Sequence, residues 1–527
     1  MFSTIIFKYR LYSSIFSAMY KIALHSKKNS IQKINELCSY YITQKTVMLL
    51  FLLLHACLLS HGQISISFPV SRAVIQRNNA NQANLNIAGH IKNSVDRIEA
   101  RLVPRAEQSR LDTIVTTSWQ IVQLNPLNFF SGTISVKGGW YNLQMRAIKN
   151  SVIVIDTMIV ERVGIGEVFV YVGHSNAQGG VYGQTGPNAT DDRVSCIAVG
   201  QEPQCNGSNP FQPAKSSDSL WCKYLQSGNE QYLPMLKFSK VSIASGIAPF
   251  CSHPWFWSIM GDSLSRKLNV PILLYGTAFG GTKSEHWYKA AKGIPFDHGF
   301  IKSSIAMPYI NLKNVLQLYV PLTGIRGILC LHGVNERNDS QEDIQMWMQG
   351  YIGQSRIDSK IDNLAWVIAL DSYLLDHGQN PAPFPLKPNP RNAQAAVAQQ
   401  AYNFQGPDLD VITDDGGGNG ISQRPDGLHF GNQGLIYAAN LWVDAINKPS
   451  FLSVSVPKLS QSFNVQSFQS GGWGNTDTWD CNCYTQKYHS MTIKTEHTVH
   501  IDLIKVKPLN LILKGKLNLN NQGFLGF

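Results

Sequence analysis

A short apolar stretch that ends in glycine and serine places the strongest constraint on the fold of this chain. Residues 168–172, Val-Phe-Val-Tyr-Val, are followed directly by Gly173-His-Ser-Asn176. The run has the length of a strand and lacks polar alternation, which indicates burial on both faces, as in a parallel sheet. Because Gly173 ends the run, Ser175 follows the carboxyl end of a strand, where open α/β sheets place their active sites.

The pattern of apolar residues changes at about residue 163. Residues 64–162 show short alternating segments without a helical period, which predicts a β-sandwich of roughly one hundred residues. In residues 163–447, apolar runs such as 325–331 alternate with amphipathic segments such as Trp255–Leu268, which predicts an α/β sheet. Residues 448–527 return to short strands and predict a β-rich module, either a solenoid or a small sandwich.

Residues 1–63 read as a presequence. Lys45 precedes an apolar run at 48–59, and a small polar segment follows as far as Gln63. This order is typical of a secretory signal peptide, and the run is shorter than the roughly 20 residues of a membrane span. We therefore expect a secreted or cell-surface protein without stable membrane insertion. Signal peptides begin near the start methionine, so we expect Met48 or a nearby codon to be the true start.

The positive charge is not distributed like that of a nucleic-acid-binding protein. The formal net charge is +11, and the first 62 residues hold seven Lys and Arg residues against one Glu, which accounts for +6 of it. The remaining +5 is modest for this length, and no dense basic run with interleaved aromatic residues occurs. We therefore expect no nucleic-acid partner.

Seven of the nine cysteines follow the presequence. Four of them cluster in a region rich in Gly, Pro and Asn, and export makes these candidates for disulfides whose pairing the sequence does not indicate: Cys196, Cys205, Cys222 and Cys251. Cys481 and Cys483 lack a second pair at zinc-site spacing, so a metal is the weaker interpretation there.

Separate segments of the α/β region supply the parts of a serine hydrolase. In Asp426-Gly-Leu-His429 the spacing lets Asp426 accept a hydrogen bond from the ring of His429, which can then take the proton of Ser175. An oxyanion hole needs further donors. The backbone N–H of Ser175, an unhindered backbone N–H at Gly280-Gly281 and the side-chain amide of Asn335 are the candidates.

Four blocks in this order resemble the signature blocks of SGNH (GDSL-type) hydrolases, closest to the sialate O-acetylesterase-like branch that includes acetyl xylan esterases. The blocks are Gly173-His-Ser-Asn176, Gly280-Gly-Thr282, Gly333-Val-Asn335 and Asp426-Gly-Leu-His429. The resemblance implies a flavodoxin-like three-layer fold and a site without metal or cofactor. It also implies removal of O-acetyl or other short acyl groups from a carbohydrate substrate through an acyl-serine intermediate.

Two positions depart from that branch. His174 stands where the branch usually has Gln, and because adjacent side chains diverge in a tight turn, we do not expect it to be the base. We expect the change to affect substrate contacts or the rigidity of the turn. In the third block, Gly333-Val-Asn-Glu336 is nearer the wider superfamily, which strengthens Asn335 as a donor and leaves Glu336 without a role.

Several other features weigh less. The literal Gly-Asp-Ser-Leu at 261–264 falls within a helical pattern, so Ser263 is the weaker candidate nucleophile. Three histidines, His286, His332 and His377, lack a carboxylate at a telling spacing. Residues 414–419 lack the closing glutamate of a calcium loop, so we interpret them as an ordinary loop. The tail resembles modules of secreted Bacteroidetes proteins, and its Trp473 and Trp479 either stack on sugars or fill a core.

Two other functions remain open at this stage. One is a non-catalytic cell-surface protein that binds carbohydrate through a decayed hydrolase domain. The other is a lipase-like enzyme for longer acyl chains, which the lack of an obvious apolar lid disfavours. The sequence does not indicate the oligomeric state.

Overall fold

The computed structural model describes residues 63–106, 114–180, 185–199, 220–250, 252–375, 387–413, 423–502, 505–520 and 523–526. The chain divides into two compact units, residues 1–62 and 63–527. The expected signal segment therefore falls almost wholly outside the described residues. Every element below belongs to the second unit. Within the described part of the chain, no helix combines the length and apolar character that crossing a membrane requires.

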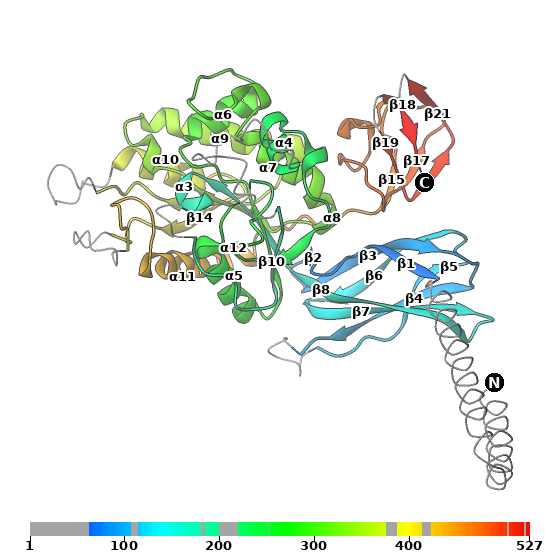
Figure 1. Ribbon diagram of the computed structural model, residues 1–527. Coiled ribbons are helices and arrows are strands. Elements are labelled where there is room, and N and C mark those ends of the chain that lie inside the picture. The colour runs from blue at the N-terminus through cyan, green and yellow to red at the C-terminus, as the bar shows by residue number, and fades with distance from the viewer. Residues whose placement is uncertain are drawn as a thin grey trace, which may run out of the picture. The chain divides into compact units, whose positions relative to one another are not determined.

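The first part of this unit consists of two packed β-sheets (Figure 1). One is antiparallel, with the order β1 (Ile64–Phe68), β3 (Gln82–Ile91) and β6 (Phe129–Lys137). The other pairs β4 (Arg97–Pro104) with β5 (Gln120–Leu124) and β7 (Gly139–Lys149), and β7 with the long strand β8 (Ile153–Gly173). The inward residues form one core, which includes Leu85, Ile98, Phe130 and Leu143, all fully buried. The alternation in the sequence therefore reflects one buried and one outward face for each strand.

Strand β8 continues without a break from the sandwich into the sheet of the α/β region. Its first part pairs antiparallel with β7, and its last part pairs parallel with β11 (Ile272–Gly276) and β12 (Gly327–Leu331). The short strand β2 (Val74–Gln76) pairs with it between these two parts. The predicted boundary between residues 162 and 163 thus falls inside one continuous strand.

The order of strands in the α/β region is β10-β9-β11-β8-β12-β13-β14. The strands not yet defined are β9 (Val194–Ile197), β10 (Phe238–Lys240), β13 (Trp366–Leu370) and β14 (Asn403–Asp408). All neighbours are parallel except β10 and β9 at one edge. Without that edge pair the order by sequence is 2-1-3-4-5, which is the flavodoxin order, and its switch point lies between β8 and β12.

Helices cover both faces of this sheet, and residues of β8 alternate between two cores. Val168, Val170 and Val172 belong to the core shared with α4 (Leu220–Ser227), α6 (Ser284–Lys292), α7 (Tyr309–Asn314), α9 (Gln341–Ser359) and α10 (Pro388–Ala398). Phe169 and Tyr171 belong to the core shared with α5 (Trp255–Leu268) and α11 (Gln433–Asn447). This explains the uninterrupted apolar run, because both sides of the strand are buried.

Short helical elements fill the connections. They are α3 (Ser175–Gln178), α8 (Val320–Thr323), α12 (Pro449–Leu452), the π-helical turn η5 (Val315–Tyr319), and the 3₁₀ turns η3 (Glu230–Tyr232), η4 (Ser303–Ile305), η6 (Val334–Glu336) and η7 (Thr476–Thr478).

The tail forms parallel rather than antiparallel sheets. Its three sheets are β15 (Asn464–Gln466) with β17 (Ser490–Ile493) and β20 (Asn510–Leu513), β16 (Gly471–Gly472) with β18 (Thr498–Asp502) and β21 (Lys516–Asn520), and β19 (Lys505–Val506) with β22 (Phe524–Leu525). Pairing between strands of successive turns is the pattern of a solenoid. Trp473 and Trp479 are 3% and 1% exposed and pack in its core, so neither presents a ring face for stacking on sugar.

The cysteines that form disulfides differ in part from those that the sequence predicted. Cys481 and Cys483 form a disulfide with each other, and Cys222 is disulfide-bonded. Cys196, expected among the disulfide formers, is a free, fully buried thiol in β9, because its side chain points into the core beside α5. Cys205 and Cys251 lie outside the described residues.

An ion cluster joins the sandwich to the sheet. The carboxylate of Glu167 in β8 is fully buried and accepts hydrogen bonds from Gln76 at 2.8 Å, Arg77 at 2.8 Å and Arg326 at 2.7 Å. Burial alone would raise the pKa of Glu167, but the two guanidinium groups and the amide together hold it below the usual value. The cluster therefore holds β2 and the start of β12 against β8.

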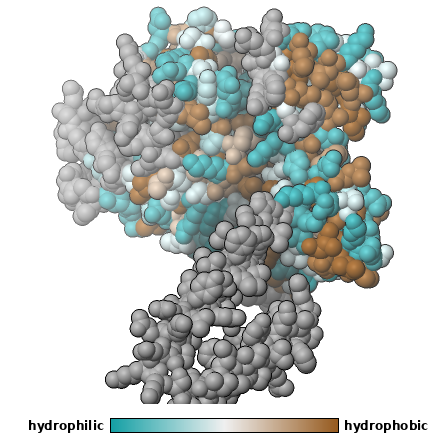
Figure 2. Space-filling model, turned by 45° about the vertical axis from the view of Figure 1, so that its right-hand side comes forward, coloured by the Kyte–Doolittle hydropathy of each residue, from teal (hydrophilic) through white to brown (hydrophobic). Residues whose placement is uncertain are grey.

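Apolar side chains reach the surface as separate patches among polar ones (Figure 2). The exposed apolar residues include Val152, Ile153 and Ile159 around the start of β8, and Ile512, Leu513 and Leu519 in β20 and β21.

Candidate active site

Ser175 lies at the turn that follows β8, at the carboxyl edge of the sheet. Gly173 has φ 148°, and a side chain there would come within 2.1 Å of the carbonyl oxygen of Leu331 in β12. Glycine is therefore needed for the two strands to approach each other closely. Ser175 begins α3, and His174 N donates to the Leu331 carbonyl at 3.3 Å. The serine thus follows the carboxyl end of a strand, as the sequence pattern predicted, and the structure places it at the switch point of the sheet.

The structure brings Ser175, His429 and Asp426 together in hydrogen-bonding order. The Oγ atom of Ser175 is 2.6 Å from Nε2 of His429, and Nδ1 of His429 is 2.6 Å from Oδ2 of Asp426. Asp426 also accepts from the backbone N–H groups of Leu428 and His429, at 3.0 and 2.7 Å. Burial alone would raise the pKa of Asp426, but these hydrogen bonds and the His429 ring lower it overall, so the carboxylate stays ionised.

Asn176 holds the loop of His429 against the turn of Ser175. Its Nδ2 donates to the carbonyl of Leu428 at 3.1 Å, and its Oδ1 accepts from the backbone N–H of Phe430 at 3.0 Å. These two backbone groups flank His429, and the Asn176 side chain is fully buried. The asparagine after the serine therefore fixes the distance between nucleophile and base, a role that the sequence did not reveal.

The three candidate oxyanion donors come from neighbouring segments. Phe279 N donates to the Gly173 carbonyl at 2.9 Å, which brings the turn at Gly281 beside that of Ser175. Gly280 N donates to Oε1 of Gln178 at 2.7 Å and is thereby engaged. Among the described residues, the N–H groups of Ser175 and Gly281 donate to no protein acceptor. Their role as oxyanion donors stays a prediction.

Asn335 lies next to this turn. One of its two amide hydrogens is used, because Nδ2 donates to the carbonyl of Thr282 at 2.8 Å. Glu336, which had no role from the sequence, is fully buried and accepts from the N–H of Ser284 at 2.5 Å, near His332 Nδ1 at 3.5 Å. Burial would raise the pKa of Glu336, but these partners lower it to about 2. Its carboxylate therefore supports the start of α6 rather than a reaction.

His174 does not lie as expected. The sequence led us to expect adjacent side chains to diverge and His174 to bear on substrate contacts or on the rigidity of the turn. Its ring is instead fully buried, with Nδ1 3.4 Å from Ser175 Oγ and Nε2 3.0 Å from Oδ2 of Asp371. A ring that has no exposed surface cannot contact substrate. Its position is therefore compatible with an effect on the rigidity of the turn and not with an effect on substrate contacts.

Of the weaker candidates, His332 lies beside His174 and has a carboxylate neighbour in Glu336, whereas the others lie away from this cluster or outside the described residues. Ser263 is on helix α5, with Arg266 Nη2 at 3.5 Å as its partner. His286 stacks on Phe296, and burial together with neighbouring His298 lowers its pKa to about 4. His377 and the loop 414–419 are not among the described residues. In the part of the chain that is described, no three His, Cys, Asp or Glu side chains gather in a way that would hold a metal ion.

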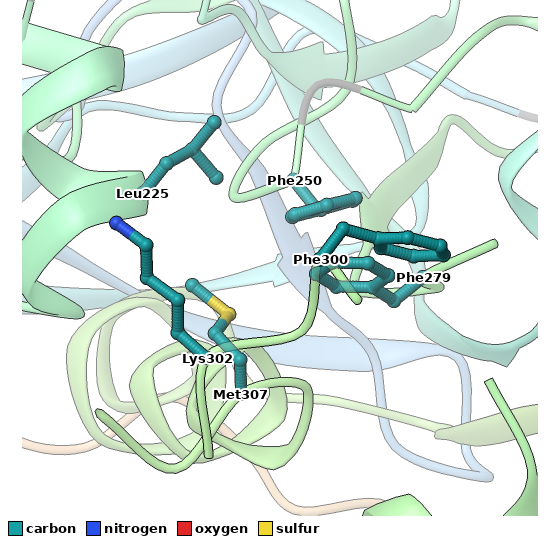
Figure 3. A pocket seen from close by; sticks show the side chains of 6 residues that line it. All are labelled: Leu225, Phe250, Phe279, Phe300, Lys302 and Met307. Atoms are coloured by element: carbon teal, nitrogen blue, oxygen red, sulfur yellow. The ribbon is translucent and has the colours of Figure 1, made fainter. Parts of the chain in front are cut away.

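Figure 3 shows a small pocket lined mainly by apolar side chains. Its lining residues are Leu225, Phe250, Phe279, Phe300, Lys302 and Met307. Phe250 and Phe279 stack at 4.3 Å between ring centroids, with Phe300 parallel to Phe279 at 6.2 Å. Phe279 immediately precedes the glycine pair, and the Phe300 ring lies against Gly281, where an added Cβ would come within 2.7 Å of it.

Comparison with known proteins finds similarity in solved structures alone. No family model matches the chain, and no curated protein does. A carbohydrate acetylesterase from Xanthomonas citri is similar over 74% of this chain and 76% of its own, with 13% identity and a TM-score of 0.41. A putative GDSL-like lipase from Parabacteroides merdae is similar over 53% and 94%, with 11% identity and a TM-score of 0.29. An Arabidopsis thaliana protein covers 55% and 98%, with 13% identity and a TM-score of 0.29. These TM-scores decide neither the fold nor the activity.

Proposed function

We propose that this protein is a serine ester hydrolase that removes O-acetyl or other short acyl groups from carbohydrate. The observation that carries the proposal is the relay from Ser175 through His429 to Asp426, with 2.6 Å at each of its two side-chain hydrogen bonds. The carbohydrate substrate comes from the resemblance of four sequence blocks to acetylesterases of the SGNH type. The signal-like segment before residue 63 leads us to propose further that the protein works outside the cytoplasm.

In the proposed reaction, Ser175 Oγ attacks the ester carbonyl while His429 Nε2 takes the hydroxyl proton. Asp426 keeps the proton of Nδ1 on the far side of the ring and stabilises the imidazolium that forms. The N–H groups of Ser175 and Gly281 and the Asn335 amide donate to the oxyanion. As the bond to the sugar oxygen breaks, His429 gives its proton to that oxygen, which leaves as a hydroxyl. His429 then takes a proton from water, which attacks the acyl carbon, and returns it to Ser175 Oγ as the acyl group leaves.

The test combines turnover with chemical labelling of the nucleophile. Protein without the first 62 residues should release acetate from an acetylated aryl ester and from acetylated xylan. An alkyl fluorophosphonate should stop the reaction, and mass spectrometry of the digest should find the phosphonyl group on Ser175. Turnover equal to the uncatalysed rate across a broad panel of acyl esters would contradict the proposal. A label on Ser263 would contradict the assignment of the nucleophile.

We further propose that the acyl group enters the apolar pocket beside Gly281. The pocket wall at Phe279 and Phe300 adjoins the residues assigned to the oxyanion, and apart from Lys302 the lining is aromatic and aliphatic, which suits a small hydrocarbon group rather than a sugar hydroxyl. The close packing of Phe300 against Gly281 then limits the length of the acyl chain.

Phe300→Ala should therefore widen the range of acyl chains accepted. We expect the ratio of kcat/KM for a butyryl ester to that for an acetyl ester to rise about tenfold, the scale at which pockets discriminate methylene groups. Phe296→Ala is the matched control, since Phe296 is a half-buried ring on the same segment that does not line the pocket. An unchanged ratio, or an equal change in both variants, would show that the acyl group binds elsewhere.

A further inference from the structure

Two imidazole rings face the hydroxyl of Ser175. Nε2 of His429 is 2.6 Å from Oγ, and Nδ1 of His174 is 3.4 Å from it. The two rings differ in surroundings, because His429 belongs to a partly exposed loop whereas His174 has no exposed surface. Substrate and bulk water therefore reach one ring and not the other, so His174 cannot act on the substrate directly.

The surroundings of His174 determine which of its nitrogens carries hydrogen. Nδ1 is 3.3 Å from the backbone N–H of Asn176, which can only donate, so Nδ1 must be an acceptor. The hydrogen of the neutral ring then lies on Nε2, which is 3.0 Å from Oδ2 of Asp371. The carboxylate of Asp371 is fully buried as well. His174 and Asp371 thus form a second His–Asp pair beneath the nucleophile, turned the opposite way to the pair of His429 and Asp426.

Asp371 is connected to the loop that carries the base. Its Oδ1 is 3.6 Å from Nη2 of Arg424, which is also fully buried. Arg424 donates to the backbone carbonyls of Leu428 at 2.5 Å and Ile412 at 2.6 Å, and its guanidinium lies 4.5 Å from the ring centre of Phe430. The loop that carries His429 is therefore joined to the Ser175 turn through Asn176, through His429 itself, and beneath both through Arg424, Asp371 and His174.

Other charged and titratable groups around His174 come from neighbouring elements. The ring of His332, at the end of β12, is 6.1 Å from that of His174, and Glu336 lies beyond it. Asp371 follows β13, and its backbone N–H donates to Gln394 of α10 at 3.1 Å. The ends of β12 and β13 and the loop that carries His429 thus enclose the His174 ring.

We propose that His174 is a positioning residue for Ser175, held in its Nε2–H form by Asp371. The single lone pair of its Nδ1 accepts the N–H of Asn176, which fixes the turn, and Ser175 Oγ lies 3.4 Å from the same nitrogen, so the ring limits where the hydroxyl can lie. This inference rests on the proposed function, since it assumes that Ser175 is the nucleophile. Glutamine could do the same work, because its amide has one acceptor and donors at similar reach, whereas leucine could not.

The first test compares His174→Leu with His174→Gln. In His174→Leu we expect kcat for an acetyl ester to fall about a hundredfold, the scale of a small misplacement of the reacting atom, with KM within twofold because the ring does not touch substrate. His174→Gln should restore kcat to within about threefold of wild type. Thermal unfolding shows whether both variants fold. A rise in KM alone, or equal loss in both variants, would overturn the positioning role.

The second test needs no activity, only wild-type protein and a folded His174→Gln variant. Long-range ¹H–¹⁵N spectra of wild-type protein labelled with ¹⁵N-histidine report the tautomer of each ring, and the signals missing from His174→Gln identify His174. We expect the neutral Nε2–H form. A neutral Nδ1–H form would overturn the inference, since that nitrogen could accept from neither Asn176 nor Ser175. Because this measurement uses no substrate, it decides the inference even if wild-type protein hydrolyses no ester and the proposed function fails.

Discussion

Ser175→Ala should lower kcat for an acetyl ester by about 10⁶-fold, the scale seen when a serine nucleophile is removed. The residual rate would come from the oxyanion donors and substrate binding alone, which the substitution leaves in place. The change removes one partly buried oxygen at the end of β8, so the fold should be retained. The measurement is steady-state acetate release, with the circular dichroism spectrum as a check on folding.

Ser263→Ala is the matched control for that experiment. Ser263 belongs to the Gly-Asp-Ser-Leu sequence but lies on helix α5, with Arg266 rather than a histidine as its partner. We expect its kcat to stay within twofold of wild type. Loss of activity in Ser263→Ala combined with retention in Ser175→Ala would reverse the assignment.

Glu167→Gln should lower the free energy of unfolding by about 4 kcal/mol near neutral pH, because removal of one partner from a buried ion pair leaves the other charge uncompensated. The charge left behind is chiefly that of Arg326, which is 2% exposed and 2.7 Å from the carboxylate. Glu161→Gln, in the same strand, is the control. Glu161 pairs with Arg162, but its side chain is 59% exposed, so its loss should cost less than about 1 kcal/mol. Urea unfolding measures both.

The effect of Glu167 should depend on pH in a defined direction. The pKa of Glu167 in the folded protein lies below the ordinary 4.5, so the folded state binds this proton more weakly than the unfolded state does. Its contribution to stability is complete above about pH 4.5 and is lost as the pH falls through the folded value. The difference between wild type and Glu167→Gln should therefore be constant from pH 6 to 8 and narrow below pH 4.5. A difference that grows on acidification would contradict this account.

Local patterns in the sequence predicted those parts of the fold and site that depend on near neighbours. The apolar run at residues 168–172 predicted a strand of a parallel sheet, and the structure gives it two parallel neighbours. Helical spacing predicted α5 and therefore that Ser263 lies on a helix. The Asp426-x-x-His429 spacing predicted a contact within one loop, which the structure shows at 2.6 Å.

The parts that the sequence did not reveal depend on residues far apart in the chain. Asp371 and Arg424 stand 197 and 53 residues from their partners His174 and Asp371, and neither lies in a recognisable motif. Asn176 was visible in its block, but its two hydrogen bonds to backbone groups 252 and 254 residues away were not. Cys196 was misassigned because composition describes a region, whereas the direction of a side chain from β9 depends on tertiary packing.

The path of β8 determines whether the α/β region can be produced without the sandwich. One strand of 21 residues passes through both sheets and delivers Ser175 at its end. Truncation at residue 163 would cut this strand and remove its antiparallel partner β7. It would also remove the hydrogen bonds that Gln76 and Arg77 donate to Glu167. We expect such a fragment to be insoluble or inactive, because the sandwich supports the strand that leads to Ser175.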